Sequence, residues 1–154
     1  MERQDEKEIQ KLRLRARKRM MDLIARRDHS EKEIRKKLKE WHEPRFIDEA
    51  VAYGKEHGWI PDDEESQAKL AGKMAEFFHK RGKGIQSINH ALKEKGLPPV
   101  KADSERELEK AMKLIANKFT EEQLTDRKTQ AKAGRFLASR GFDMNTVRQV
   151  IFKR

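Results

Sequence analysis

Cysteine is absent from this sequence of 154 residues, and proline and glycine are scarce, with four and eight residues. Without cysteine there are no disulfides or thiolate metal sites, which fits a reducing compartment. Long apolar runs are missing too, since none approaches the roughly 18 to 20 residues that span a membrane. The first residues lack the apolar stretch of a signal peptide and include acids that argue against a mitochondrial transit peptide. We therefore expect a cytoplasmic location and no membrane contact.

Hydrophobic residues make up 35% of the chain and charged residues 42%, which leaves little material for a thick core. Several thin helical layers, each burying one apolar stripe, suit this composition better than one globule. The scarcity of proline and glycine leaves most of the chain able to form helix. We predict an all-α fold.

One pattern occurs three times, each time centred on an arginine: Arg27, Arg81 and Arg140. A large apolar residue stands four positions earlier, and aliphatic residues stand seven and eleven positions later. These are Leu23, Phe77 and Phe136, then Ile34, Ile88 and Val147, then Leu38, Leu92 and Ile151. The spacing predicts tandem helical repeats at residues 12–60, 61–103 and 104–154. Residues 1–11 read as a charged arm with a frayed or disordered start.

Capping signals support the repeat. Three residues after each arginine stands an acceptable N-cap: Ser30, Gly84 and Asp143. A glycine follows the arginine in two copies, at Gly82 and Gly141, where a left-handed C-cap is expected. Capping boxes are predicted at Ser30–Glu33, Ser104–Glu107 and Thr120–Gln123.

The net charge of +10 indicates an anionic partner. Net charges of +6, −5, +5, −3 and +7 follow one another over residues 1–40, 41–76, 77–101, 102–126 and 127–154. The basic segments contain the repeated turns, so stacked repeats would present a basic stripe. The alternative is a solvated surface on which positive and negative side chains are mixed. Charges mixed at random would not alternate in step with the repeat. The three arginines also lie where the C-terminus of a helix favours positive charge. This stabilising role is compatible with a role in binding an anionic partner.

The sequence shows no motif that is typical of a catalytic or metal-binding site. Position 87 is Ser87, so the glycines at 82 and 84 do not complete a dinucleotide-binding pattern, and no phosphate-binding loop motif occurs. The five histidines are scattered without metal-ligand spacing. The acids of residues 62–65 suit the start of a helix better than a magnesium site. We expect no enzyme and no cofactor.

With these residues in view, residues 20–154 resemble the RecX family of recombination regulators. The resemblance rests on Arg27-Asp28-His29-Ser30, Gly58-Trp59-Ile60-Pro61-Asp62-Asp63, Lys80-Arg81-Gly82-Lys83-Gly84-Ile85 and Arg135-Phe136-Leu137 with Arg140-Gly141-Phe142. Ile85 departs from the pattern, because the family usually has proline there. The resemblance implies three-helix units in a curved, elongated array with a basic concave face.

The resemblance also implies a function in DNA repair, recombination and the SOS response. A monomer would bind in the groove of the RecA–DNA filament and contact single- and double-stranded DNA largely without sequence preference. It would inhibit strand exchange, ATPase and coprotease activity. We expect the basic face to include Arg26, Arg27, Arg35, Lys36, Lys80, Arg81, Lys83, Arg140 and Arg148.

Two alternatives stay open. Gly82 to Ile88 and Gly141 to Val147 have the glycine-to-aliphatic spacing of a DNA-reading helix-turn-helix, which suggests a sequence-specific DNA binder. A small α-solenoid that binds an acidic protein is the other.

Overall fold

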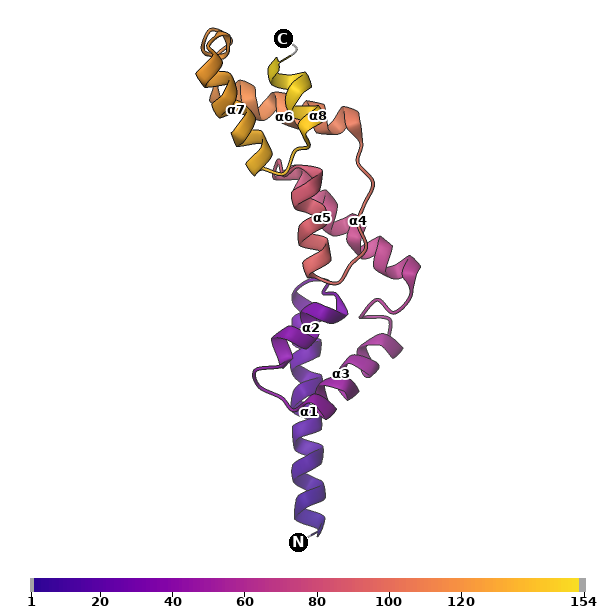
Figure 1. Cartoon of the computed structure of the whole chain (residues 1–154). Coiled ribbons are helices and arrows are strands. Elements are labelled where there is room, and N and C mark those ends of the chain that lie inside the picture. Colours follow the sequence, from indigo (N-terminus) through magenta and orange to yellow (C-terminus); the bar gives the residue numbers. More distant parts are fainter. Residues whose placement is uncertain (1, 153–154) are drawn as a thin grey trace. The chain divides into compact units, whose positions relative to one another are not determined.

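Every regular element of the computed structural model is helical, over the described residues 2–152 (Figure 1). This confirms the all-α class. The helices are α1 (Glu2–Arg26), α2 (Glu31–Leu38), α3 (Pro44–Glu56), α4 (Glu64–Lys80), α5 (Ile85–Glu94), α6 (Ser104–Lys118), α7 (Arg127–Ser139) and α8 (Met144–Val147). A 3₁₀ turn, η1 (Gln123–Thr125), precedes α7, and a π-helical turn, η2 (Arg148–Phe152), continues α8. Within residues 2–152 no helix is long and apolar enough to cross a bilayer.

The chain divides into two compact units. Unit 1 contains the described residues up to Leu70 together with Lys95–Leu97, and unit 2 contains Ala71–Glu94 and the described residues from Pro98 onward. The predicted arm is not separate, because residues 2–11 form the first part of α1; Met1 lies outside the described residues. The division into repeats at 12–60, 61–103 and 104–154 stays a prediction.

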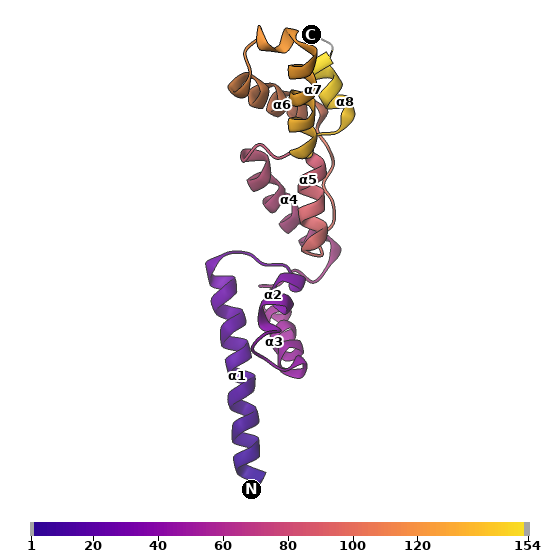
Figure 2. The ribbon, with the colours of Figure 1, turned by 60° about the vertical axis from the view of Figure 1, so that its left-hand side comes forward.

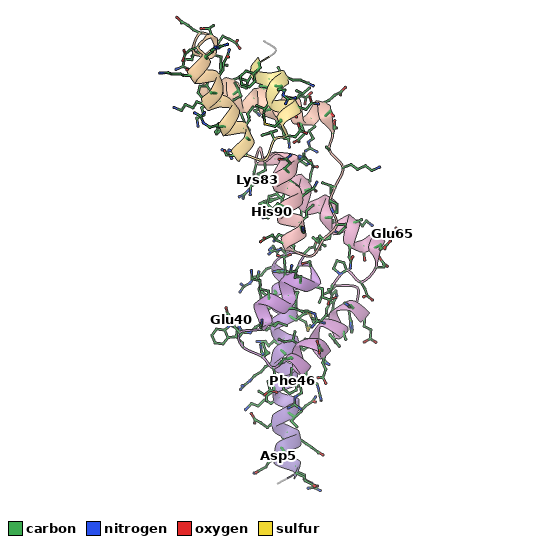
Figure 3. The ribbon with its side chains drawn as sticks, viewed as in Figure 1. Asp5, Glu40, Phe46, Glu65, Lys83 and His90 are labelled. Carbon is green, nitrogen blue, oxygen red and sulfur yellow. The ribbon has the colours of Figure 1, made fainter. Side chains whose placement is uncertain are left out.

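In unit 1 the apolar face of α1 packs against α2 and α3, which lie beside it in both views (Figures 1 and 2). Ala16 and Met20 are fully buried, and Ile9, Leu12, Leu23 and Ile24 pack partly against the same core. Their spacing of three and four residues places them on one side of the helix. From α3, Phe46 enters this core and is 2% exposed (Figure 3). One side of α1 is therefore packed into the core of unit 1.

In unit 2 a second core forms where α6, α7 and α8 meet. The buried side chains are Ala111, Ile115, Leu124, Ala133, Leu137, Phe142, Val147, Val150 and Ile151. The expected burial of the aliphatic positions of the repeat is confirmed in both units, because all six of these residues are at most 1% exposed. The apolar position four residues before the arginine is not always buried, since Phe77 is 52% exposed.

Two of the three predicted capping boxes are confirmed. The Glu33 amide donates to Ser30 Oγ at 3.2 Å, and the Ser30 amide donates to Glu33 Oε1 at 3.1 Å. Thr120 and Gln123 form the same reciprocal pair at η1. The Ser104–Glu107 box is wrong, because Asp103 caps α6. Glu107 is 2% exposed and accepts instead from the Ile85 amide at 2.7 Å.

The two glycine-containing turns of unit 2 contact each other through their backbones. The Gly84 amide donates to the Arg140 carbonyl at 2.8 Å, and the Gln86 amide donates to the Gly141 carbonyl at 3.0 Å. Gly82 and Gly141 have φ values of +78° and +94°, which confirms their left-handed conformation at the helix ends. The α4–α5 turn is thereby hydrogen-bonded to the α7–α8 turn.

The amide of Ile85 leads to a testable prediction. Ile85 is the first residue of α5, a position where proline normally costs nothing. Here proline would remove the donor to Glu107 Oε1 and leave a buried acceptor unpaired. We expect Ile85→Pro to lower the free energy of unfolding by about 1–3 kcal/mol, measured by urea denaturation and circular dichroism.

Ile85→Val is the matched control, because it keeps the amide and should cost about 0.5–1.5 kcal/mol. A proline variant as stable as the valine variant would show that the Ile85–Glu107 hydrogen bond does not stabilise unit 2.

Candidate anion-binding grooves

Helix α1 directs its basic residues to two different sides. Arg13 Nε lies 2.5 Å from Glu49 Oε2, and the Arg17 guanidinium carbon lies 4.0 Å from the centre of the Tyr53 ring. These two arginines therefore contact α3. Because residues three and four apart share a helix face, Arg15, Lys18 and Arg19 occupy another side of α1, in register with Arg26.

This other side borders a groove of about 640 Å³ in unit 1. The unit 1 groove is formed by α1, α2 and the segment after α2, and one acid, Asp22, lies in its lining. Its cations are Arg15, Lys18, Arg19, Arg26 and Lys37, and Leu23, Trp41 and His42 complete it. No residue in the described part of the chain forms an ion pair with Arg15, Lys18 or Arg26. The groove therefore presents cations that the fold does not neutralise.

A buried histidine lies behind Lys37. His29 is 1% exposed; its Nδ1 donates to the Arg27 carbonyl at 2.8 Å, and its Nε2 accepts from Lys37 Nζ at 3.0 Å. Burial, with the charges of Arg27 and Lys37, lowers the pKa of His29, which favours the neutral ring that this geometry needs. Burial and the Arg27 charge also lower the pKa of Lys37. A bound anion would offset this repulsion between cations.

A second groove, of about 390 Å³, lies in unit 2 between the end of α4 and α6. One acid, Glu109, lines it. The unit 2 groove has five cations, Lys80, Arg81, Arg106, Lys110 and Lys113, and its other lining residues are His79, Gly82, Leu114 and Asn117.

Two of these cations form ion pairs and hydrogen bonds within unit 2. Arg106 makes a two-pronged ion pair with Glu76, at 3.0 and 2.6 Å. The Lys110 side chain is only 10% exposed, and its ammonium group contacts His79 Nδ1 at 2.8 Å, the Lys83 carbonyl at 2.7 Å and Glu107 Oε2 at 2.5 Å. Burial and the neighbouring Lys110 charge lower the pKa of His79, consistent with a neutral ring that accepts from lysine. Over residues 2–152, Lys80, Arg81 and Lys113 form no ion pair.

The structure brings three of the nine predicted residues into grooves. Arg26 lines the unit 1 groove, and Lys80 and Arg81 line the unit 2 groove. The Arg81 guanidinium carbon lies 4.2 Å from the centre of the exposed Phe77 ring, which holds it by a cation–π contact. Lys83 lies in the turn before α5, with Nζ 4.9 Å from the centre of the Phe78 ring (Figure 3).

Lys83 is not among the lining residues, and the other five predicted residues also lie outside both grooves. Arg27 pairs with Glu33 at 2.7 Å, and Arg35 pairs with Glu31 at 2.9 Å and Asp48 at 2.6 Å, so both stabilise unit 1. Lys36, Arg140 and Arg148 are exposed, and the Arg140 guanidinium carbon lies 5.4 Å from the centre of the Phe136 ring. A binding role for all nine stays a prediction.

Sequence reasoning missed several lining residues. The spacing of Arg15, Arg19 and Arg26 is a signal that could have been used, because it places them along one side of a helix. Lys37 and Trp41 come from another part of the chain and reach the groove only through packing of α2 on α1. Lys113 lies in a segment whose net charge is negative, so segment totals hide it.

Comparison with known proteins identifies related chains. Family models of the RecX first and third three-helix domains match residues 16–53 and 105–151. The regulatory protein RecX of Vibrio cholerae is 32% identical over 85% of this chain and 88% of that protein. The regulatory protein RecX of Serratia proteamaculans is 27% identical over 86% of this chain and 93% of that protein.

Among solved structures, RecX from Lactobacillus salivarius matches 93% of this chain and 96% of its own, with a TM-score of 0.73 and 17% identity. Another regulatory protein RecX matches 93% of this chain and 74% of its own, with a TM-score of 0.68 and 22% identity. These structures support the fold, while the two domain models and the Vibrio cholerae relative establish the relationship in sequence. The chain belongs to the RecX family of regulatory proteins.

Proposed function

We propose that this regulatory protein inhibits the RecA recombinase without catalysing a reaction itself. It binds in the groove of the RecA–DNA filament in the cytoplasm as a monomer, and so limits strand exchange, ATP turnover and coprotease activity. The observation that carries the proposal is the pair of basic grooves, each lined by five cations and one acid. A nucleoprotein filament is a polyanion for which such surfaces are suited.

The chemistry of the grooves favours the phosphate backbone over base edges. Lysine and arginine neutralise phosphates without regard to sequence, and their binding weakens steeply with salt through counterion release. The cations that remain outside ion pairs in the described chain, such as Arg15, Arg26, Lys80 and Lys113, can make such contacts without breaking the fold. Binding to DNA should therefore be salt-sensitive and nearly independent of sequence.

Charge reversal in the unit 2 groove tests the proposal. The protein is titrated into RecA filaments on single-stranded DNA, and ATP turnover is followed. Lys80→Glu, Arg81→Glu and Lys113→Glu combined should raise the concentration needed for half-inhibition by about tenfold or more, because three attractive contacts become repulsive. Circular dichroism should show unchanged helix content.

The matched control reverses Lys101, Lys128 and Lys132, which are exposed and lie outside both grooves. It makes the same change in net charge, and its inhibition should stay within about twofold of the unmodified protein if contact rather than total charge matters. Absence of any effect of the unmodified protein on ATP turnover would refute the proposal. A strong preference for one duplex sequence would instead favour the helix-turn-helix alternative.

A further inference from the structure

Trp41 is more exposed than the fold of unit 1 requires. Its side chain and backbone together are 67% exposed, and the ring does not belong to the apolar cluster that holds the unit together. Trp59 differs, because it packs against that cluster and its ring stacks on His57 with 4.7 Å between centroids. A large aromatic side chain left in water is a common feature of binding surfaces.

The surroundings of Trp41 hold it at the unit 1 groove. The amides of Trp41 and His42 both donate to the Leu38 carbonyl at 3.1 Å, which fixes the turn after α2. The Arg19 guanidinium carbon lies 5.4 Å from the centre of the indole ring, so α1 supplies a cation–π contact. The ring thus lies in a fixed turn beside a row of cations.

A basic groove beside an exposed aromatic ring is the combination that binds unpaired nucleic acid strands, with phosphates on the cations and a base on the ring. Arg15 and Arg26 are eleven residues apart on α1, a distance of about 16 Å along the helix axis. This length accommodates a few consecutive phosphates. In a duplex the bases are already stacked on their neighbours and offer no open face to an indole.

We propose that Trp41 stacks on an unpaired base and makes the unit 1 groove prefer single strands over duplex. Arg15, Lys18 and Arg26 bind the backbone phosphates of either form, and Trp41 adds a contact that only a single strand provides. Trp41 is therefore a specificity-determining residue of the proposed DNA contact. The inference extends the proposed function, but its test contains no recombinase.

Tryptophan fluorescence provides the direct measurement. The chain has two tryptophans, so Trp59→Phe leaves Trp41 as the reporter. An oligothymidylate of about 12 nucleotides should quench the remaining emission in a saturable way, because thymine stacks on the indole. A duplex of the same length should bind with little quenching. Saturable binding of the oligothymidylate without quenching would overturn the inference.

Trp41→Ala should weaken oligothymidylate binding about 5- to 150-fold, the range expected for one stacked base, and change duplex affinity by less than about twofold. Trp41→Phe should retain part of the preference, whereas Arg15→Glu should weaken both forms. Equal losses on both forms after Trp41→Ala would also overturn the inference. Because these assays use DNA alone, a failure of RecA inhibition in the separate ATP-turnover assay would refute the proposed function and leave this result standing.

Discussion

Gly84→Ala is expected to destabilise unit 2 by about 3–4 kcal/mol. A Cβ atom at this position would overlap the carbonyl carbon and oxygen of Gly141 and the amide nitrogen of Phe142. All three are backbone atoms, so no side chain can rotate away. Moving the α7–α8 turn instead would stretch the hydrogen bond from the Gly84 amide to the Arg140 carbonyl.

Urea denaturation followed by circular dichroism measures this loss, and Gly72→Ala is the matched control. Gly72 lies exposed within α4, and nothing comes within 4 Å of a Cβ built there. The same substitution should therefore stabilise the protein by about 0.5–1 kcal/mol, because alanine is the better helix former. Similar effects of the two substitutions would mean that the contact between the turns is dispensable.

Glu33→Gln is expected to cost unit 1 about 3 kcal/mol at neutral pH. The Glu33 side chain is 9% exposed and accepts from Arg27 at 2.7 Å, from Lys95 at 2.9 Å and from the Ser30 amide at 3.1 Å. Burial alone would raise the pKa of Glu33, but these three donors outweigh it and lower the pKa from 4.5 to about 2. Glutamine keeps the shape and loses the charge that pairs with two cations.

The pH dependence of this effect follows from the lowered pKa. The ionised form stabilises the folded state fully above pH 4.5, and this contribution is lost as the pH falls towards about 2. The difference in stability between the two proteins should shrink over that interval. Tryptophan fluorescence during urea denaturation reports it, because both tryptophans lie in unit 1.

Glu40→Gln is the control for this prediction, since Glu40 lies exposed after α2 (Figure 3) and should change stability by less than about 0.5 kcal/mol. A difference between Glu33→Gln and the unmodified protein that stayed constant from pH 7 to pH 2 would contradict the role of the Glu33 charge.

The helical class, the repeat and most caps could be predicted from the sequence because they depend on local spacing. Ser30 and Glu33 are three residues apart, and Ile34 and Leu38 lie one turn apart on the buried side of α2. Glu107 shows where local rules fail. Its spacing from Ser104 fits a capping box, but tertiary packing buries it against α5, and the Ile85 amide becomes its donor.

The grooves were less predictable than the fold. Charge counts by segment drew attention to Arg26, Lys80 and Arg81, which line the grooves. The same counts could not separate cations that face a groove from those paired within the fold, such as Arg27 with Glu33 and Arg35 with Asp48. That separation depends on partners distant in sequence, and so does the position of Trp41.

The backbone contact between the two turns of unit 2 has a consequence for how this protein can change. Its hydrogen bonds join the main chains of Gly84, Gln86, Arg140 and Gly141, so they do not depend on the side chain of Arg140 or on that of the nearby Arg81. Arg81 and Arg140 can be exchanged for other residues while the glycines hold the scaffold. The side-chain charge at these two turns can therefore be altered by evolution or by design while the backbone contact is kept.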